Sequence, residues 1–228
     1  MKPCTNSFGT LVLKEAMLKL ANLYNRIELN RSPIKWLIVL ILWMVLGYML
    51  PNKINLIEPI MVPKTFVDAL IPLSPVWIWP YISYYFFIFG TFLFVRSEHV
   101  KKLVFSSYSL SAAVACLIFF LIPTAIEREN YPIQENAVGL SVWALNFIRS
   151  ADTSINCLPS MHIALSAMAA LALIKESRKL TLPAVLWFLL ISYSTMATKQ
   201  HYFLDVAAGV LFGLFFWLYS NKLFKISN

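Results

Sequence analysis

Two of the three histidines in the chain, His162 and His201, stand where long apolar runs begin. Ionisable side chains within apolar segments are rare, and they are functional candidates by default. The third histidine, His99, lies in the charged stretch RSEHVKK and is interpreted as a solvated loop residue. Any chemistry is therefore expected around His162 and His201.

His201 lies in the stretch TKQHYFLDVAAG, four residues before Asp205 and two after Lys199. On a helix, this spacing places His201 and Asp205 on one face. A carboxylate beside a histidine fixes its tautomer and favours the imidazolium, which is half of a nucleophile or base arrangement. A structural salt bridge, or anchoring of Lys199 and His201 at the membrane surface, would produce the same pattern.

His162 closes the stretch CLPSMH, directly before the apolar run from Ile163 to Ile174. Ser160 is able to cap a helix there, and Pro159 suits the first helical turn. A helix N-terminus also offers backbone N–H groups to an anion, and His162 would stand beside that anion as a proton donor. Together these features predict a phosphate site with an acid attached.

Arg128, in the stretch IPTAIEREN, is one of two arginines in the segments between apolar runs that are expected on the outer side. A guanidinium binds phosphate oxygens in bidentate fashion, so Arg128 is a candidate phosphate ligand. Pairing with Glu127 or Glu129 is the alternative interpretation.

The composition indicates the kind of scaffold that must bring these residues together. Of the 228 residues, 59% are hydrophobic and 13% are charged, whereas soluble domains carry about 25% charged residues. With a mean hydropathy of +0.69, an integral membrane protein is expected. The net charge of +8 comes from lysines and arginines clustered between apolar runs, so no nucleic-acid partner is expected. Three scattered cysteines give no disulfide framework and no metal-ligand spacing.

A membrane-spanning helix needs about 20 mostly apolar residues. We expect an all-α, polytopic membrane bundle of six transmembrane helices within residues 34–220, a single catalytic domain. An amphipathic helix within residues 1–33 is expected to lie on the cytoplasmic membrane surface, with packing on the cytoplasmic loops as the alternative, and residues 221–228 form a cytoplasmic tail. The predicted spans are 34–50, 77–95, 103–122, 160–174, 182–198 and 202–220.

Lysine and arginine residues concentrate on one side of the predicted spans, which places both termini in the cytoplasm. The proline-rich segment 51–76 is expected to form a loop with at most short helices, and it lies on the outer side with segment 123–159. Low mass and short loops favour a bacterial inner membrane protein whose candidate site faces the periplasm.

The ordered motifs resemble the type-2 phosphatidic acid phosphatase superfamily, the lipid phosphate phosphatases, over roughly residues 80–220. That superfamily carries the patterns K-x6-R-P, P-S-G-H and S-R-x5-H-x3-D. The first is reduced here to Arg128; the second is Pro159-Ser160-Met161-His162, and the third is Ser194-Thr195, five residues, His201, three residues and Asp205.

The chain departs from the pattern at four positions: Leu121 replaces lysine, no proline directly follows Arg128, Met161 replaces glycine and Thr195 replaces arginine. The forms P-S-x-H and K-Q-H-Y-x-x-D-V are similar to the branch that includes inositol phosphorylceramide and sphingomyelin synthases. Those proteins are phosphotransferases, so the departures put simple hydrolysis in doubt.

The resemblance implies a role for each residue. His201 would attack phosphorus and form a phosphohistidine, Asp205 would orient His201, and His162 would protonate the leaving oxygen. The phosphoryl oxygens would be held by Arg128, Ser160 and Lys199, with Lys199 supplying the charge of the missing arginine. No metal or other cofactor is expected, and the expected partners are a lipid phosphate substrate and the membrane lipids.

Several alternatives stay open at this point. The acceptor of the phosphoryl group is either water or a lipid or sugar hydroxyl. An intramembrane serine protease with Ser160 as the nucleophile is a rival, although no G-x-S-G surrounds that residue. A non-catalytic lipid transporter or binder would also place ionisable groups along a membrane pathway.

Overall fold

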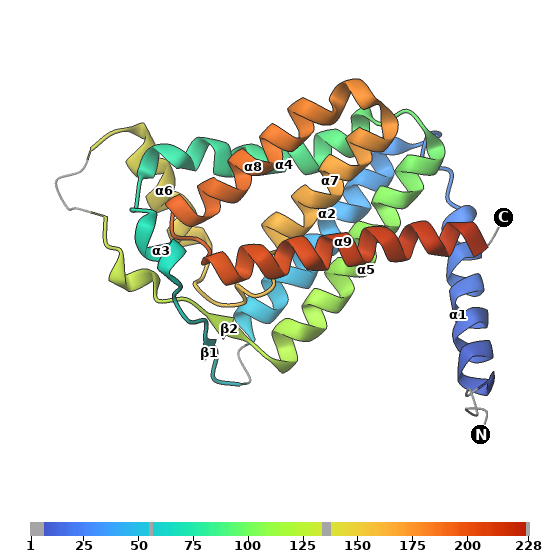
Figure 1. Cartoon of the computed structure of the whole chain (residues 1–228), viewed down its shortest axis with the longest axis horizontal. Coiled ribbons are helices and arrows are strands. Elements are labelled where there is room, and N and C mark those ends of the chain that lie inside the picture. Colours follow the sequence, from blue (N-terminus) through green and yellow to red (C-terminus); the bar gives the residue numbers. More distant parts are fainter. Residues whose placement is uncertain (1–6, 55–56, 134–137, 227–228) are drawn as a thin grey trace.

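The computed structural model describes residues 7–54, 57–133 and 138–226, and it is built almost entirely of helices (Figure 1). The expected all-α class is therefore confirmed. The long helices are α1 (Ser7–Asn25), α2 (Pro33–Lys53), α4 (Ile78–Phe94), α5 (Glu98–Leu121), α7 (Met161–Glu176), α8 (Thr181–Ala197) and α9 (Phe203–Ile226).

Within the described residues, five helical segments are long and apolar enough to cross a membrane: Pro33–Asn52, Pro75–Phe94, Glu98–Leu121, Arg178–Ala197 and Phe203–Lys225. The remaining predicted span, 160–174, is the 16-residue helix α7. At 1.5 Å per residue α7 measures about 24 Å, less than the hydrocarbon core of about 30 Å. The expected count of six spans is thus not confirmed.

Helix α7 occupies the centre of the bundle, where it contacts α4, α5, α8 and α9. Every side chain from Ile163 to Ala170 is buried. A helix that is apolar on all sides is buried either among other helices or in lipid. The contacts with four helices show that the middle of α7 is surrounded by protein.

Helix α9 crosses α7 so closely that two positions require glycine. A Cβ atom added at Gly209 would lie 2.5 Å from the backbone oxygen of Ser160, and one added at Gly213 would lie 2.5 Å from that of Ala164. Small residues four apart are the usual means of bringing membrane helices together. The Ser160 N–H also donates to the Asp205 backbone oxygen at 3.1 Å, which fixes the starts of both helices side by side.

Helix α1 packs across α5 and α9 at one end of the bundle, at the right of Figure 1. Its buried face consists of Met17, Ala21 and Tyr24. The Tyr24 hydroxyl lies 2.6 Å from Ser109 Oγ, and its ring contacts Phe105 and Phe224. Packing on other helices thus accounts for one face of α1, and its placement on the membrane surface stays a prediction.

The two segments expected on the outer side lie together at the opposite end of the molecule (Figure 1). The first forms β1 (Ile60–Met61), α3 (Phe66–Leu70) and the short helix η1 (Pro75–Trp77), and the second forms β2 (Thr124–Ala125), η2 (Arg128–Asn130) and α6 (Leu140–Ala151). Strands β1 and β2 pair in parallel, with Ile60 opposite Thr124. Short helices in segment 51–76 were expected, whereas the pairing of the two segments was not.

Replacing Gly209 by Ala is expected to destabilise the protein, because the added Cβ would overlap the backbone oxygen of Ser160, directly before α7, and that atom cannot rotate away. Overpacking of this kind costs about 1–3 kcal/mol, which exceeds the gain in helix propensity from Gly to Ala of about 1 kcal/mol. The melting temperature of the detergent-solubilised protein measures the effect. Gly47→Ala is the matched control, since a Cβ there comes no closer than 3.6 Å to another group. Equal melting temperatures for the two variants would contradict the role of the crossing.

Candidate active site

The three residues expected to carry the chemistry lie together where α7 and α9 begin. His201 Nε2 is 3.3 Å from His162 Nδ1, and His201 Nδ1 is 3.5 Å from Asp205 Oδ2. The side chains of His201 and Asp205 are 8% and 0% exposed. The expected His201–Asp205 pair forms, although His201 lies in the turn before α9 rather than on the helix.

The turn between α8 and α9 is shaped by backbone contacts around Thr195. Both Gln200 and His201 donate their backbone N–H to the Thr195 carbonyl. Lys199 adopts a positive φ of 54°, a conformation that non-glycine residues rarely take and that lets the chain reverse here. Asp205 Oδ2 accepts a hydrogen bond from the Tyr202 N–H at 2.8 Å, so one carboxylate both caps α9 and faces His201.

His162 is held by two tyrosines of α4 that the sequence interpretation did not identify. Its Nε2 atom lies 2.9 Å from the Tyr81 hydroxyl, and the rings of Tyr81 and Tyr84 lie 4.9 and 4.5 Å from the imidazole ring. Three tyrosines at positions 81, 84 and 85 of an apolar helix were the available signal. These contacts leave His162 Nδ1 directed at His201.

Ser160 is the N-cap of α7, as expected, and its Oγ accepts a hydrogen bond from the Ile163 N–H at 3.4 Å. Pro159 was expected in the first helical turn, and that expectation is wrong. The helix begins at Met161, so Pro159 precedes the cap, and the Leu158–Pro159 peptide bond is cis. The first N–H groups of α7 thus lie beside both histidines.

A cavity of about 420 Å³ runs from these histidines between α2, α4 and α5. Its walls are largely apolar, and its polar end includes His162, His201, Asp152 and Tyr48. The apolar lining residues include Ile41, Met44, Val45, Phe89, Ala112, Ala115 and Phe119. A cavity of this size and lining suits a small ligand with an apolar chain and one polar end.

Arg128 is the first residue of η2, in the second outer segment, and is 8% exposed. Its guanidinium donates to the backbone carbonyls of Asp152 and Thr153. It forms no ion pair with Glu127 or Glu129, the alternative that its sequence neighbours suggested, and Glu127 pairs instead with Lys64 at 3.1 Å. Within the described residues, Arg128 therefore has no carboxylate at ion-pair distance.

Arg149 is a second cation of the site, and no role was predicted for it. Its guanidinium donates to the backbone carbonyls of Tyr131 and Thr198. Burial, and then the charge of Arg128, lower the pKa of Arg149 to about 10. Among the described residues, no carboxylate lies within ion-pair distance of either arginine. Two neighbouring unpaired cations favour binding of an anion.

Lys199 is buried, but its ammonium group contacts the outer loop. It donates to the backbone carbonyls of Asp68 and Ile71 and lies 4.6 Å from the Tyr131 ring centre. The Phe203 N–H in turn donates to Asp68 Oδ1 at 2.8 Å, so the loop around α3 is fastened onto the turn that carries His201. The phosphate-binding role expected for Lys199 stays a prediction.

Buried polar atoms without a hydrogen-bond partner are concentrated around the turn between α8 and α9, which carries His201. Of the 11 buried side-chain polar atoms that lack a hydrogen bond in the described part of the chain, 8 belong to the site and its immediate surroundings. They are Arg128 Nε, Arg149 Nε, Asn156 Oδ1, both amide atoms of Gln200, His201 Nδ1, the Tyr202 hydroxyl and Asp205 Oδ1. Because buried polar groups are normally satisfied, such a cluster indicates a place where a polar ligand or water binds.

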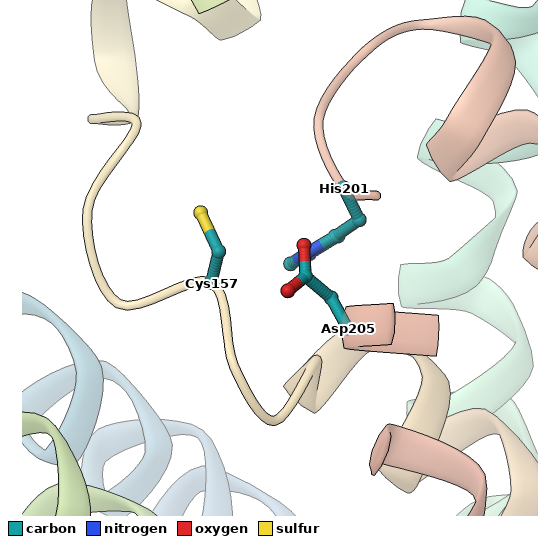
Figure 2. Close-up of side chains that lie close together, drawn as sticks. All are labelled: Cys157, His201 and Asp205. Carbon is teal, nitrogen blue, oxygen red and sulfur yellow. The ribbon is translucent and has the colours of Figure 1, made fainter. Parts of the chain in front are cut away.

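Cys157 lies next to the His201–Asp205 pair (Figure 2). Its thiol, a nitrogen of His201 and a carboxylate oxygen of Asp205 all lie within 4.8 Å of one another. These donors suit zinc, although no such spacing was visible in the sequence. Burial, and then the charge of Asp205, raise the pKa of the Cys157 thiol. A metal bound here would compete with the contact between His201 Nδ1 and Asp205.

Comparison with known proteins gives one finding. A family model of the PAP2 superfamily matches residues 67–219. This range includes all the candidate site residues, among them His162, His201 and Asp205. Neither the curated proteins nor the solved structures compared with the chain contain a significant match.

Replacing Arg149 by Ala is expected to weaken the binding of inorganic phosphate, because one of two unpaired cations is lost. A hydrogen bond to a charged group contributes about 1.5–3 kcal/mol, so the dissociation constant should rise about 10-fold to 100-fold. Thermal stabilisation of the purified protein by phosphate, at constant ionic strength, measures the affinity. Arg178→Ala, an exposed arginine in the loop before α8, is the control. Unchanged affinity in Arg149→Ala would remove Arg149 from the site.

Proposed function

The chain belongs to the PAP2 superfamily, and on this premise we propose that it is a membrane-embedded lipid phosphatase or phosphotransferase acting through a phosphohistidine at His201. Membership supports phosphatase-type or phosphotransferase-type chemistry. The observation that carries the finer proposal is the contact between His201 Nε2 and His162 Nδ1 at the polar end of an apolar cavity. The substrate is a lipid phosphate ester or pyrophosphate.

His201 supplies the nucleophile through Nε2. When Nδ1 carries the proton and faces Asp205, the lone pair on Nε2 is free to attack phosphorus. The N–P bond forms while the bond from phosphorus to the leaving oxygen breaks. Asp205 is fully buried, so its charge stabilises the positive charge that develops on the imidazole.

His162 supplies the proton for the leaving oxygen from Nδ1. Its other nitrogen lies against the Tyr81 hydroxyl, which fixes the orientation of the ring. In the second half of the reaction, His162 takes a proton from the acceptor as the acceptor oxygen bonds to phosphorus and the N–P bond breaks. General acid–base catalysis of this kind contributes about 10²-fold to 10⁴-fold in rate.

Arg128, Ser160, Lys199 and the newly identified Arg149 are the candidate ligands for the phosphoryl oxygens. Support comes from the two arginines, which have no carboxylate partner in the described part of the chain, and from the N-terminus of α7, whose N–H groups and dipole favour an anion. Fixed donors aimed at developing charge usually provide the largest single contribution to catalysis. Protein cations alone supply this charge in the proposed mechanism.

The apolar cavity supports a lipid as the leaving group or acceptor. Its walls are formed by helices that are expected in the membrane, so a lipid chain would occupy it without leaving an apolar environment. In an outward orientation, which the distribution of charged residues favours, the reaction would take place on the periplasmic side of a bacterial inner membrane.

The rival functions predict different contacts. A serine protease needs a histidine bonded to its nucleophile, whereas Ser160 Oγ is buried and engaged with the Ile163 N–H in the described structure. A transporter or binder would hold a lipid phosphate without breaking a bond. Transfer to an alcohol instead of water is the second form of the proposed reaction.

Replacing His201 by Ala should abolish both release and transfer of phosphate from every lipid substrate, with a loss of at least about 10³-fold in kcat. Purified protein in detergent micelles with labelled lipid phosphates provides the assay, and denaturation at alkaline pH during turnover should trap a labelled phosphohistidine. His99→Ala is the control, because His99 is exposed; it lies in the first turn of α5 and not in a loop, as its charged neighbours had suggested. Full turnover in His201→Ala would refute the mechanism, and binding without turnover in the unmodified protein would favour a transporter.

Replacing Tyr81 by Phe should lower kcat about 10-fold to 100-fold and leave KM nearly unchanged. The reason is that His162 loses a hydrogen bond that is worth about 1.5–3 kcal/mol when the imidazole is charged. Tyr193→Phe is the matched control, since its ring packs on Trp77 at the surface. An equal kcat in the two variants would exclude positioning of His162 by Tyr81.

A further inference from the structure

We infer that Asp152, held by Tyr48, is a second recognition point in the cavity and binds a hydroxyl or ammonium group located beside the reacting phosphate. The inference rests on the proposed function, because it assigns part of the same cavity to the portion of the ligand that is not phosphate. It narrows the substrate class to lipids, or acceptors, that present a hydrogen-bond donor close to the phosphorus atom.

Asp152 is placed at the polar end of the cavity by the end of α6. Its backbone N–H donates to the Ile148 carbonyl at 2.9 Å, which completes the last turn of that helix. Asp152 then lines the cavity together with Asn156, His162 and His201. A carboxylate and the two proposed catalytic imidazoles therefore line the same cavity.

Tyr48, from α2, holds the carboxylate with a short hydrogen bond of 2.6 Å from its hydroxyl to Asp152 Oδ1. An ionised carboxylate offers about four acceptor sites, so most of its capacity stays open. Within the described residues, no lysine, arginine or histidine nitrogen lies within ion-pair distance of this carboxylate. Arg128 contacts the backbone oxygen of Asp152 instead.

The cations and the carboxylate divide the site into two parts. Arg128, Ser160 and Lys199 are absent from the cavity lining, whereas Asp152 belongs to it. The non-bridging phosphoryl oxygens are therefore expected on the side of the cations, and the ester oxygen with its carbon chain on the side of Asp152. Asp152 would therefore contact a hydroxyl or ammonium group on the carbon chain close to that ester oxygen.

A carboxylate that has no ion-pair partner among the described residues, in a largely apolar cavity, would select among lipid phosphates. It repels negative charge and leaves its own acceptor sites unfilled when the ligand has no donor. A hydroxyl or ammonium group on the carbon next to the phosphate ester fills those sites. A plain alkyl phosphate, or a diacyl lipid phosphate whose hydroxyls are all esterified, offers no such group.

The test compares three phosphates of equal chain length in detergent micelles. Sphinganine 1-phosphate carries an ammonium and a hydroxyl group, its N-acetyl derivative keeps the hydroxyl without the charge, and octadecyl phosphate lacks both. The unmodified protein should favour the first two over octadecyl phosphate about 10-fold to 100-fold in kcat/KM. In Asp152→Asn the preference should fall to a few-fold, mainly through KM.

Tyr48→Phe is the matched control, because it removes the same hydrogen bond between α2 and Asp152 but keeps the carboxylate. The preference should persist in Tyr48→Phe. A merely structural role for Asp152 would lower kcat/KM for all three phosphates by one factor in both variants. Either that result or an equal kcat/KM for the three phosphates in the unmodified protein would exclude the subsite on the substrate side. The inference is overturned when the enzyme also shows no preference between a diol and a simple alcohol as acceptor.

The hydroxyl or ammonium group that contacts Asp152 can also belong to the alcohol that accepts the phosphoryl group. Transfer of phosphate from octadecyl phosphate to 1,2-dodecanediol, compared with 1-dodecanol, tests this source. Preference for the diol that disappears in Asp152→Asn supports the subsite on the acceptor side.

Failure of the proposed function gives a different pattern. If the unmodified protein and His201→Ala both leave every phosphate intact, the enzymatic proposal fails, and equilibrium binding of the three phosphates then decides the inference. Tighter binding of the donor-bearing lipids to the unmodified protein than to Asp152→Asn would still support the subsite, and equal binding would overturn it.

Discussion

The close crossing of α7 and α9 is the contact on which the site depends. Gly209 and Gly213 allow the two backbones to meet, and the Ser160–Asp205 backbone hydrogen bond fixes where along the helices they meet. His162 stands two residues after Ser160 and His201 four before Asp205, so this crossing sets the separation of the two imidazoles. A shift of α9 by a single residue would move its ends by about 1.5 Å, enough to break contacts of hydrogen-bond length.

A second constraint comes from where polar atoms are placed in an apolar molecule. The described structure buries α7 on all sides, yet it leaves several polar atoms around the turn before α9 without hydrogen bonds. In a membrane, each such atom costs free energy unless a ligand or water satisfies it. The outer segments enclose this turn through the contacts of Lys199 and Asp68. Binding of a charged headgroup requires polar atoms that have no partner within the protein and that are shielded from lipid.

The sequence allowed the helices and the central pair of the site to be predicted, because hydropathy and a spacing of four residues are local properties. The apolar run 160–174 was expected to cross the membrane, but hydropathy does not distinguish a short helix surrounded by protein from one surrounded by lipid. Tyr81, Arg149 and Asp152 were missed for another reason. Each acts through contacts with residues tens of positions away, which only the packing of helices determines. Lys199 was predicted to bind phosphate because of its position in the sequence. In the structure its ammonium group instead contacts the outer loop around α3.

The site contains two carboxylates in unlike surroundings, and the difference bears on the choice between water and an alcohol as acceptor. Asp205 is fully buried against His201, the proposed nucleophile. Asp152 is half-buried in the cavity and has open acceptor capacity. Water needs no recognition point beyond His162 to approach a phosphohistidine, whereas an alcohol must be oriented against the competing water. A carboxylate that holds a second hydroxyl of the acceptor would supply that orientation. On the proposed role of Asp152, phosphoryl transfer to an alcohol would be favoured over hydrolysis if the acceptor is the ligand that Asp152 contacts.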